Sequence, residues 1–166
     1  METGFSFGSN EGDRVANIRE AKKRIMALPG VVFRAQSPLY ETEPVGVLPE
    51  YADIRFLNSV LIVDSAYTPA EWLEHLHKIE KDLGRTRLND RNAPRSIDVD
   101  ILYVGDACID SGGLTVPHPR WAKRRFVVQP LADVRPDLVL PGAGKTVREI
   151  LSGLEGEEVT ALSVDW

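Results

Sequence analysis

The order of its segments predicts that this chain has an α+β fold with a ferredoxin-like βαββαβ core, followed by additional C-terminal helices and a strand. The first observation behind this prediction is that four strand-like segments and two capped, amphipathic helical segments follow one another in that order. The second is that 166 residues, 43% of them hydrophobic, are enough for one domain, residues 1–166, to bury a sizeable core.

The first half of the predicted core is a strand, a helix and a second strand. Residues 4–9, GFSFGS, alternate small and aromatic side chains, as a strand with two different faces does. Asp13 can cap a helix that continues to about Leu28, where a Pro-Gly pair ends it. Residues 31–42 are expected to form the second strand, and the acidic, Pro- and Gly-rich residues 43–53 an exposed loop.

The second half of the predicted core repeats this pattern with stronger signals. Residues 55–65 form the third strand. Thr68 and Glu71 make a capping box at the start of a helix, and Gly84 stands where a C-terminal cap belongs. Residues 96–104, SIDVDILYV, are the fourth strand.

Beyond the core, the sequence predicts helices at residues 118–131 and 144–154 and a last strand within residues 157–164. The Gly-Lys-Thr at 144–146 is similar to part of a phosphate-binding P-loop, but Val139 stands where that motif needs its first glycine. We therefore interpret this stretch as a turn before a helix.

The charge of the chain is unevenly distributed. Its formal net charge is −5, yet residues 85–95 contain four arginines and one aspartate, and residues 118–126 contain four basic residues and no acid. An acidic protein with two small basic patches favours a compact polyanion such as a nucleotide over a long nucleic acid. Two solvated basic turns are the alternative.

The sequence also bears on the setting of the protein. It contains no apolar run near the roughly 20 residues that cross a bilayer, and its N-terminal residues do not have the pattern of a signal peptide. Cys108 is the only cysteine, so neither an internal disulfide nor a cysteine-based metal site can form. We expect a cytoplasmic monomer that acts on small molecules, with neither nucleic acid nor membrane as a partner.

Two carboxylates occupy the fourth predicted strand. Asp98 and Asp100 are two residues apart, so both side chains project from one face, while Ile97, Val99 and Ile101 occupy the other. Mg²⁺ takes one or two carboxylates together with phosphate oxygens, and two such ions roughly 3.5–4 Å apart neutralise attacking and leaving oxygens in phosphoryl chemistry. A charged edge strand that discourages sheet pairing and a salt-bridged structural pair are the alternatives.

The loop before this strand favours the metal interpretation. It carries Arg85, Arg87, Arg91 and Arg95, whose planar guanidinium groups suit phosphate oxygens. Neutralising two aspartates would need only one or two arginines.

The third predicted strand carries features that suit a flat heterocycle. Phe56 and Asn58 share one face of it, so the ring can stack on a heterocycle and the amide can bind its polar edge. A buried aromatic residue beside an asparagine with its own partners is the alternative.

The histidines give a weaker signal. His75 and His77 lie on one helix and face different ways, without metal-ligand spacing, and His77 is the better candidate for a site. His118 lies between two prolines in the second basic patch, where a structural or exposed histidine is the alternative.

Together these segments resemble the 6-hydroxymethyl-7,8-dihydropterin pyrophosphokinase family, a kinase family of the folate pathway. The most specific match is RNAPRSIDVDIL at residues 91–102. Six further segments match in the family's order, over residues 5 to about 140: GSN at 8–10, SPLYETEPVG at 37–46, FLNSVLIV at 56–63, IEKDLGRTR at 79–87, LTVPHPR at 114–120 and RRFVVQPL at 124–131.

The resemblance implies transfer of the pyrophosphoryl group of MgATP to the hydroxymethyl oxygen of 6-hydroxymethyl-7,8-dihydropterin, with release of AMP. It implies ATP as a co-substrate and two Mg²⁺ ions, bound by Asp98 and Asp100, that bridge the triphosphate. Arg85 and Arg95 resemble the arginines that steady the moving phosphates, and Arg85 would lie on a loop that closes over them.

The resemblance also implies residues for the two substrate sites. Those expected at ATP are Arg87, His118 and Arg124 at the phosphates, and His77, Glu80, Ile101 and Thr115 at the nucleotide. Those expected at the pterin are Phe56 and Phe126 as the two sandwiching rings, Asn58 at the polar edge, and the main chain of Thr42, Glu43 and Val45.

Two departures from the family pattern concern the nucleotide. Asn92 replaces a frequent aromatic residue of the closing loop, and Gly113 replaces a basic residue. They bear on how tightly the nucleotide is held, not on which reaction occurs.

Other classes of protein share parts of this pattern. An RNA-binding module of ferredoxin-like fold would need aromatic residues on a basic central sheet, where this chain has the acidic SIDVDIL. A two-metal nuclease would have no use for Phe56, Asn58 and Phe126. A folded but inactive relative is a third alternative.

Overall fold

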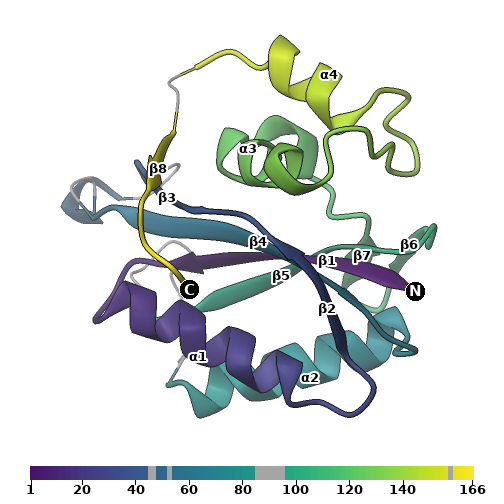
Figure 1. The fold of residues 1–166 in the computed structure, drawn as a ribbon, viewed down its shortest axis with the longest axis horizontal. Coiled ribbons are helices and arrows are strands. Elements are labelled where there is room, and N and C mark those ends of the chain that lie inside the picture. The colour runs from purple at the N-terminus through teal and green to yellow at the C-terminus, as the bar shows by residue number, and fades with distance from the viewer. Residues whose placement is uncertain (45–47, 52–53, 85–95, 157–158) are drawn as a thin grey trace.

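A six-stranded antiparallel sheet forms the middle of the molecule (Figure 1). The structure is a computed structural model that describes residues 1–44, 48–51, 54–84, 96–156 and 159–166. The strands lie in the order β5-β1-β4-β3-β8, and β2 also pairs with β4. Their bounds are β1 Glu2–Ser9, β2 Val32–Gln36, β3 Leu39–Thr42, β4 Phe56–Asp64, β5 Asp98–Val104 and β8 Thr160–Leu162.

Helices cover both faces of this sheet. Figure 1 shows α1 and α2 on one face and α3 with α4 on the other. The remaining elements are α1 Arg14–Met26, α2 Pro69–Asp82, α3 Arg125–Val134, α4 Val147–Gly153, the 3₁₀ turns η1 Pro49–Tyr51 and η2 Trp121–Lys123, and a hairpin of β6 Ile109–Ser111 and β7 Leu114–Val116. The predicted ferredoxin-like core is confirmed, because β5, β1, β4 and the β2–β3 segment lie side by side in the order of that fold.

The alternation in β1 gives the sheet its two different faces. Phe5 and Phe7 are fully buried in the core beneath α1 and α2, where the Phe5 ring meets Trp72 edge-on at a centroid distance of 4.7 Å. Gly4 and Gly8 point to the opposite face. Burying two phenylalanines stabilises the fold by about 1.5–3 kcal/mol each and fixes which face is which.

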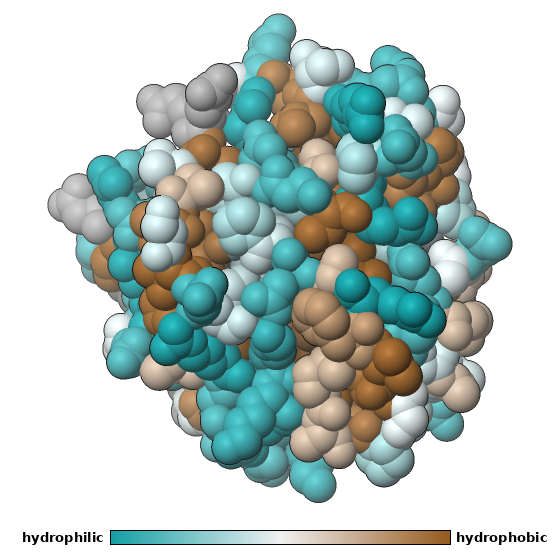
Figure 2. Space-filling model, in the orientation of Figure 1, coloured by the Kyte–Doolittle hydropathy of each residue, from teal (hydrophilic) through white to brown (hydrophobic). Residues whose placement is uncertain are grey.

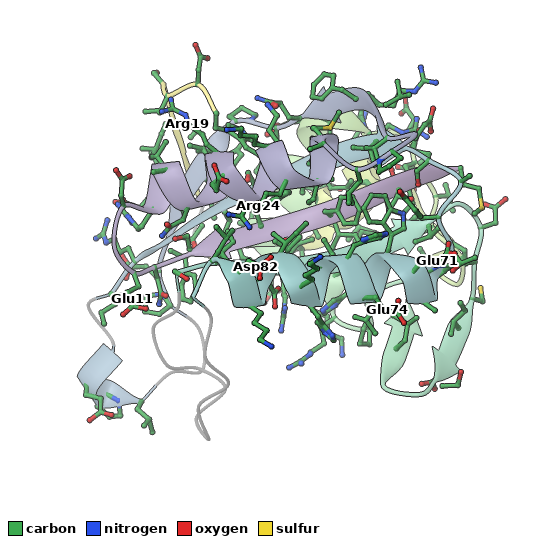
Figure 3. All side chains as sticks on the ribbon, turned by 90° about the horizontal axis from the view of Figure 1, so that it is seen from below. Glu11, Arg19, Arg24, Glu71, Glu74 and Asp82 are labelled. Atoms are coloured by element: carbon green, nitrogen blue, oxygen red, sulfur yellow. The ribbon has the colours of Figure 1, made fainter. Side chains whose placement is uncertain are left out.

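The predicted helix starts are confirmed by hydrogen bonds. The Asp13 side chain accepts the N–H of Ala16 at 3.1 Å at the start of α1. Thr68 and Glu71 form the reciprocal capping box of α2. Figure 3 shows the two helices side by side, with an ion pair of 3.6 Å between Arg24 of α1 and Asp82 of α2.

The predicted second strand, residues 31–42, is instead two strands. Pro38 has no N–H to donate, and the break falls beside it. Ser37 fills the gap, because its N–H donates to the Val60 carbonyl and its Oγ accepts the Val60 N–H, both at 2.9 Å.

The helix predicted at residues 118–131 starts later than expected. Trp121–Lys123 form the 3₁₀ turn η2, and α3 begins only at Arg125. The reason is that Pro119 disfavours a helical conformation at His118, whose N–H donates instead to the Leu102 carbonyl of β5 at 2.8 Å.

The last predicted elements are also shorter than expected. The helix predicted at 144–154 is α4, which begins after a capping box of Thr146 and Glu149. The last strand is β8, three residues within the predicted 157–164. The β6–β7 hairpin was not predicted.

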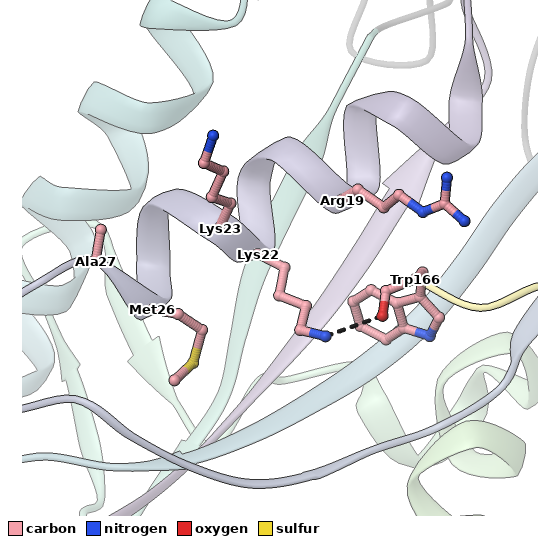
Figure 4. A pocket seen from close by; sticks show the side chains of 6 residues that line it. All are labelled: Arg19, Lys22, Lys23, Met26, Ala27 and Trp166. Atoms are coloured by element: carbon pink, nitrogen blue, oxygen red, sulfur yellow. Dashed lines mark hydrogen bonds between the residues drawn. The ribbon is translucent and has the colours of Figure 1, made fainter.

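The segment after β8 returns to the α1 face and ends in Trp166. The indole N–H of Trp166 donates to the Ser37 carbonyl at 2.7 Å, and its ring meets Phe7 edge-on at 5.5 Å. The Trp166 carbonyl accepts from Lys22 at 2.9 Å, at a shallow pocket on α1 that Figure 4 shows. This segment therefore ties α1 to the β2–β3 junction.

The surface is mostly polar. Figure 2 shows polar residues over most of one face, with an apolar area at lower right, where β2 lies in Figure 1. Val32 and Phe33 of β2 are 53% and 45% exposed. Of the helices in the described ranges, none has the length and apolar character that crossing a bilayer requires.

Candidate functional site

The acid pair lies at the start of β5. Asp98 and Asp100 are half-buried on the α3 face, whereas Val99 and Ile101 are buried in the core under α1 and α2. The predicted division of this strand into a polar and an apolar face is therefore confirmed. A register shift opposite Gly4 then changes the alternation.

A row of four paired residues joins the acid pair to the middle of the sheet. Tyr40 of β3 pairs with Asn58 of β4, Asn58 with Gly8 of β1, and Gly8 with Asp98 of β5. Gly8, which is buried, puts no side chain between Asn58 and Asp98. A Cβ at Gly8 would stand 3.5 Å from the Asn58 Oδ1 and 3.8 Å from the ring of Phe56.

Asn58 is held in one orientation. Its amide N–H donates to the Thr42 Oγ1, and both residues are buried. Its Oδ1 consequently lies on the side of Gly8. Phe56 lies two residues away on the same face and is half-buried.

The start of α3 lies over the same face of the sheet as Asn58 and Phe56 (Figure 1). Phe126 lies in the first turn of α3 and is half-buried, with the Arg124 guanidinium 5.5 Å from the centre of its ring. Since α3 contacts β4, Phe126 belongs to a helix that packs on the strand carrying Phe56 and Asn58.

The imidazole of His118 lies beside the acid pair. The His118 Nε2 lies 3.8 Å from the Asp100 Oδ2, and its Nδ1 accepts the N–H of Arg120 at 3.1 Å. Burial, together with the charges of Arg124 and Arg120, lowers the pKa of His118 to about 4. His118 is therefore neutral near pH 7, with its proton on Nε2, the nitrogen that faces Asp100.

Arg124 interacts electrostatically with His118 and with the same two aspartates. Burial, and then the charge of Arg120, lower the pKa of its guanidinium, while Asp100 and Asp98 raise it. The two aspartates thus sit within the electrostatic reach of both Arg124 and His118.

The residues expected at the nucleotide occupy different surroundings. His77 is exposed on α2, and Thr115 is exposed on β7 with its Oγ1 bonded to Asp110 at 3.3 Å. The side chain of Ile101 is buried in the core, so only its main chain could reach a ligand. Glu80 is 6% exposed, and its Oε1 accepts the N–H of Val99 at 2.8 Å.

Glu43 was expected to contribute its main chain to the pterin site. Glu43 is exposed, and its carboxylate pairs with Arg55 at 3.0 Å, on the way into the loop. Arg85, Arg87, Arg95 and Val45 lie outside the described residues.

The donor set suits magnesium. Across the described ranges, there is no cluster of three or more His, Cys, Asp or Glu side chains that could hold a metal ion. Two half-buried carboxylates on one strand face fit Mg²⁺, which is commonly held by one or two carboxylates plus phosphate oxygens.

Three parts of this arrangement were missed from the sequence. Gly8 is recognised only within the GSN match, the Arg120 N–H that fixes the His118 ring carries no sequence signal, and the bond of Glu80 to the main chain of β5 was not predicted. The one available signal was Glu80 itself, a charged residue directly after Ile79 on the apolar face of a helix.

Fold and site together define the class: an α+β protein of ferredoxin-like topology with a pair of half-buried carboxylates, a buried asparagine and a half-buried phenylalanine on one face of its sheet. The chain belongs to the 7,8-dihydro-6-hydroxymethylpterin-pyrophosphokinase (HPPK) family, whose sequence model matches residues 4–136.

Similar proteins agree with this membership. The chain is 39% identical over 151 residues to the 2-amino-4-hydroxy-6-hydroxymethyldihydropteridine pyrophosphokinase of Methylorubrum extorquens, which covers 91% of this chain and 92% of that protein. It is 44% identical over 133 residues to the mitochondrial folate synthesis bifunctional protein of Pisum sativum, covering 80% of this chain and 25% of that protein. A crystal structure of Plasmodium falciparum HPPK-DHPS with pterin and p-hydroxybenzoate superposes with a TM-score of 0.72 at 16% identity, over 91% of this chain and 42% of that one.

The relatives differ in length. The chain spans only 19–25% of several longer folate-synthesis proteins of fungi and plants, but more than nine tenths of the bacterial pyrophosphokinases of Methylorubrum extorquens and Pseudomonas aeruginosa.

Proposed function

We propose that this protein transfers pyrophosphate from MgATP to the hydroxymethyl group of 6-hydroxymethyl-7,8-dihydropterin, giving AMP and the pterin diphosphate, a step of folate biosynthesis. Family membership supports this proposal. The structural observation that carries it is the row from Asn58 through Gly8 to Asp98. It places an amide suited to a heterocycle and a carboxylate suited to a metal on one face of the sheet, with only a glycine between them.

On the pterin side, the chain offers an oriented acceptor. Because Asn58 gives its N–H to Thr42, its Oδ1 is available to accept from ring N–H groups of a heterocycle lying over Gly8. Phe56 and Phe126 supply the stacking surfaces, and base-type stacking contributes about 1–3 kcal/mol per ring. A site that pairs with polar groups of its substrate rejects analogues lacking them by roughly 10⁴–10⁵-fold.

On the phosphate side, the chain offers positioning and charge. Mg²⁺ held by Asp98 and Asp100 would neutralise charge on the triphosphate. Neutral His118 can donate from Nε2 to a phosphate oxygen, because the Arg120 N–H holds its ring. Arg124 supplies a fixed positive charge beside it.

The reaction needs no covalent intermediate with the protein. The hydroxymethyl oxygen forms a bond to the β-phosphorus of ATP, the bond from that phosphorus to the oxygen bridging it to the α-phosphorus breaks, AMP leaves with that oxygen, and the hydroxyl proton is released. Phosphoryl transfer asks a protein mainly for alignment and charge stabilisation. We extend the proposal to Arg85 and Arg95 as the residues that steady the moving phosphates, and to Arg87 at the ATP phosphates, on the basis of the sequence match.

We also propose the finer features of the active unit. These are two Mg²⁺ ions, one domain formed by residues 1–166, and a monomer in a reducing, cytoplasmic setting. Cys108 is exposed and has no partner cysteine, which suits a reducing setting. Light scattering of the purified protein tests the monomer.

The decisive experiment identifies the nucleotide product. Incubation with MgATP and 6-hydroxymethyl-7,8-dihydropterin should release AMP in a one-to-one ratio with the pterin diphosphate, as measured by chromatography. Release of ADP would mean transfer of a single phosphate and would overturn the proposed reaction. Salt-resistant RNA binding, or metal-dependent nicking of DNA, without any pterin product would favour the two rival classes.

A further inference from the structure

A buried carboxylate holds the strand that carries the acid pair. Glu80 lies in the last turn of α2 and is only 6% exposed, next to Ile79 on the face of the helix that packs on the sheet. Its Oε1 accepts the N–H of Val99 at 2.8 Å in a buried hydrogen bond. Burying a carboxylate is costly unless hydrogen bonds satisfy it, so this bond is a specific feature of the fold.

The position of the Val99 N–H explains what this bond does. β5 lies at the end of the strand order found in the described part of the chain, and its inner side pairs with β1, where Val99 is opposite Phe7. In an antiparallel pair, alternate residues direct their N–H groups toward the partner strand and away from it. The Val99 N–H points away from β1 and meets Glu80, so β5 is held from both sides.

The same N–H belongs to the residue between the two proposed metal ligands. Asp98 precedes Val99 and Asp100 follows it, so the direction of both carboxylates depends on how the main chain at Val99 is placed. A bond from a backbone N–H to a carboxylate is charge-assisted and stronger than one between neutral groups. Glu80 is therefore well suited to fix that main chain.

A second contact from the same end of α2 supports this arrangement. The Ser96 Oγ donates to the carbonyl of Leu83 at 3.1 Å, and the Ser9 Oγ of β1 donates to the carbonyl of Ser96. The end of α2 thus contacts the chain both just before Asp98 and between the two aspartates.

We propose that Glu80 is a positioning residue for Asp98 and Asp100, which acts through the main chain of Val99 and not as a ligand of the nucleotide. The metal role of the acid pair rests on the proposed function. Groups that orient metal ligands typically change metal affinity or activity by about 10–100-fold when they are removed, and small displacements of reacting groups have effects of a similar size.

Three variants separate the acceptor from its charge and from its position on the helix. Glu80→Gln keeps an acceptor oxygen in the same place, while Glu80→Met keeps the length of the side chain without an acceptor. Glu74→Met is the matched control, because Glu74 is an exposed residue of the same helix (Figure 3).

We expect Glu80→Met to lower kcat by about 10–100-fold and to raise the Mg²⁺ concentration needed for half-maximal turnover. Its affinity for ATP without Mg²⁺ should be unchanged. Hydrogen exchange of the Val99 amide, followed by NMR, should be slow in the parent protein and in Glu80→Gln, and fast in Glu80→Met. Glu80→Gln should turn over within a few-fold of the parent, and Glu74→Met should match it.

Two outcomes would overturn the proposal. One is a loss of metal-free ATP affinity in both Glu80 variants with no change in Val99 exchange, since that would make Glu80 a nucleotide ligand. The other is rapid exchange of the Val99 amide in the folded parent protein, which needs no variant and so does not depend on whether Glu80→Met folds.

Failure of the proposed function would look different. A parent protein that makes no AMP would disprove the reaction, while Val99 exchange and Mn²⁺ binding, measured by water proton relaxation in the parent and the two Glu80 variants, would still decide the role of Glu80. Equal Mn²⁺ affinity in all three proteins would overturn that role.

Discussion

Each face of the central sheet carries an apolar cluster, but at the end of the sheet where Gly8 pairs with Asp98 the two faces of the same strands differ. Under α1 and α2, the strands present Phe5, Phe7 and Val99, all nearly or fully buried in one apolar cluster. On the α3 face, the neighbouring positions of the same strands are small or polar, and include Gly8 and Asp98.

The comparison shows how a thin sheet can carry both a core and a site. One residue along a strand separates a position in the apolar core from a position on the face of the proposed site, because successive side chains alternate between the faces. Asp98 and Val99 are the sharpest example. Substitution of Asp98 should therefore lower turnover, whereas substitution of Val99 should lower the stability of the fold.

The largest expected effect is on turnover. Asp98→Ala and Asp100→Ala should each lower kcat by at least about 10²–10³-fold, the size seen when one electrostatic stabiliser of a transition state is removed. Their melting temperatures should be close to that of the parent, because both carboxylates are only half-buried. Steady-state assay of AMP release and thermal melting measure the two quantities.

The matched control is Val99→Ala, between the two aspartates. It should lower the free energy of unfolding by about 2 kcal/mol, because it leaves a cavity in the core, and change turnover far less than either aspartate variant. If either aspartate variant kept turnover within a few-fold of the parent, the contrast between the faces would not hold and the metal role would be refuted.

Much of the fold could be predicted because its signals are local. The GFSFGS alternation, the Asp13 cap and the Thr68–Glu71 capping box each depend on residues within one segment, and all three are confirmed. The pattern of residues 31–42 predicts one continuous strand, because the alternation of side chains does not show that Pro38, which has no N–H, interrupts the pairing. The bonds of Ser37 to Val60, which replace the missing pairing, connect residues 23 apart and leave no local signal.

The site, too, has features that a local stretch of sequence predicts and features that depend on residues far apart in the chain. The projection of Asp98 and Asp100 from one face follows from strand geometry, so it could be predicted. That Gly8 lies between Asn58 and Asp98 depends on the order of strands in the sheet, and no single segment contains that information. The bond from Val99 to Glu80 likewise joins a helix to a strand that is distant in sequence.

The next effect is on stability in acid. His118 has a pKa of about 4 in the folded protein, lowered by burial first and then by Arg124 and Arg120, against about 6.5 when unfolded. Because the unfolded chain binds the proton more readily, the contribution of neutral His118 is fully present above pH 6.5 and is lost as the pH falls toward 4. The loss should reach up to about 3 kcal/mol.

His118→Asn tests this expectation, because its amide oxygen can still accept the N–H of Arg120 and it does not titrate. Urea unfolding at pH 7.5 and 4.5 should show a smaller decrease in stability for the variant than for the parent. An equal decrease in both proteins would mean that His118 is already solvated, and that its neutral state is not imposed by the fold.

A smaller effect separates two glycines of β1. A Cβ at Gly8 would make only ordinary contacts, so Gly8→Ala should fold normally. Its methyl group would, however, occupy space between the side chains of Asn58 and Asp98 that the pterin is proposed to fill. We expect the Kd for the pterin, measured by calorimetry, to rise about tenfold, the low end of the cost of inserting a methyl group into a filled space.

Gly4→Ala provides the contrast. Its Cβ would lie within 3 Å of two ring carbons of Tyr103, which is 2% exposed and cannot move aside. This variant should lose about 1–3 kcal/mol of stability and bind the pterin as the parent does once folded. Equal pterin affinity in Gly8→Ala and Gly4→Ala would show that the surface above Gly8 does not hold the pterin.

The smallest effect concerns a charged residue on the wrong face for the site. Glu41 lies between Tyr40 and Thr42 on β3, so it points toward α1, where it pairs with Arg14 at 2.9 Å and with Arg55 at 3.5 Å. Hydrogen bonding to Arg14 is the main reason why the pKa of Glu41 is lowered.

Glu41→Gln should lower the free energy of unfolding by only about 0.5–1 kcal/mol, as loss of a partly exposed ion pair does, and only above the pH at which the unfolded carboxyl ionises. Turnover should equal that of the parent, because a charge on this face contributes to holding the strand and not to the chemistry. A turnover reduced as far as in Asp98→Ala would show that the two faces are not independent.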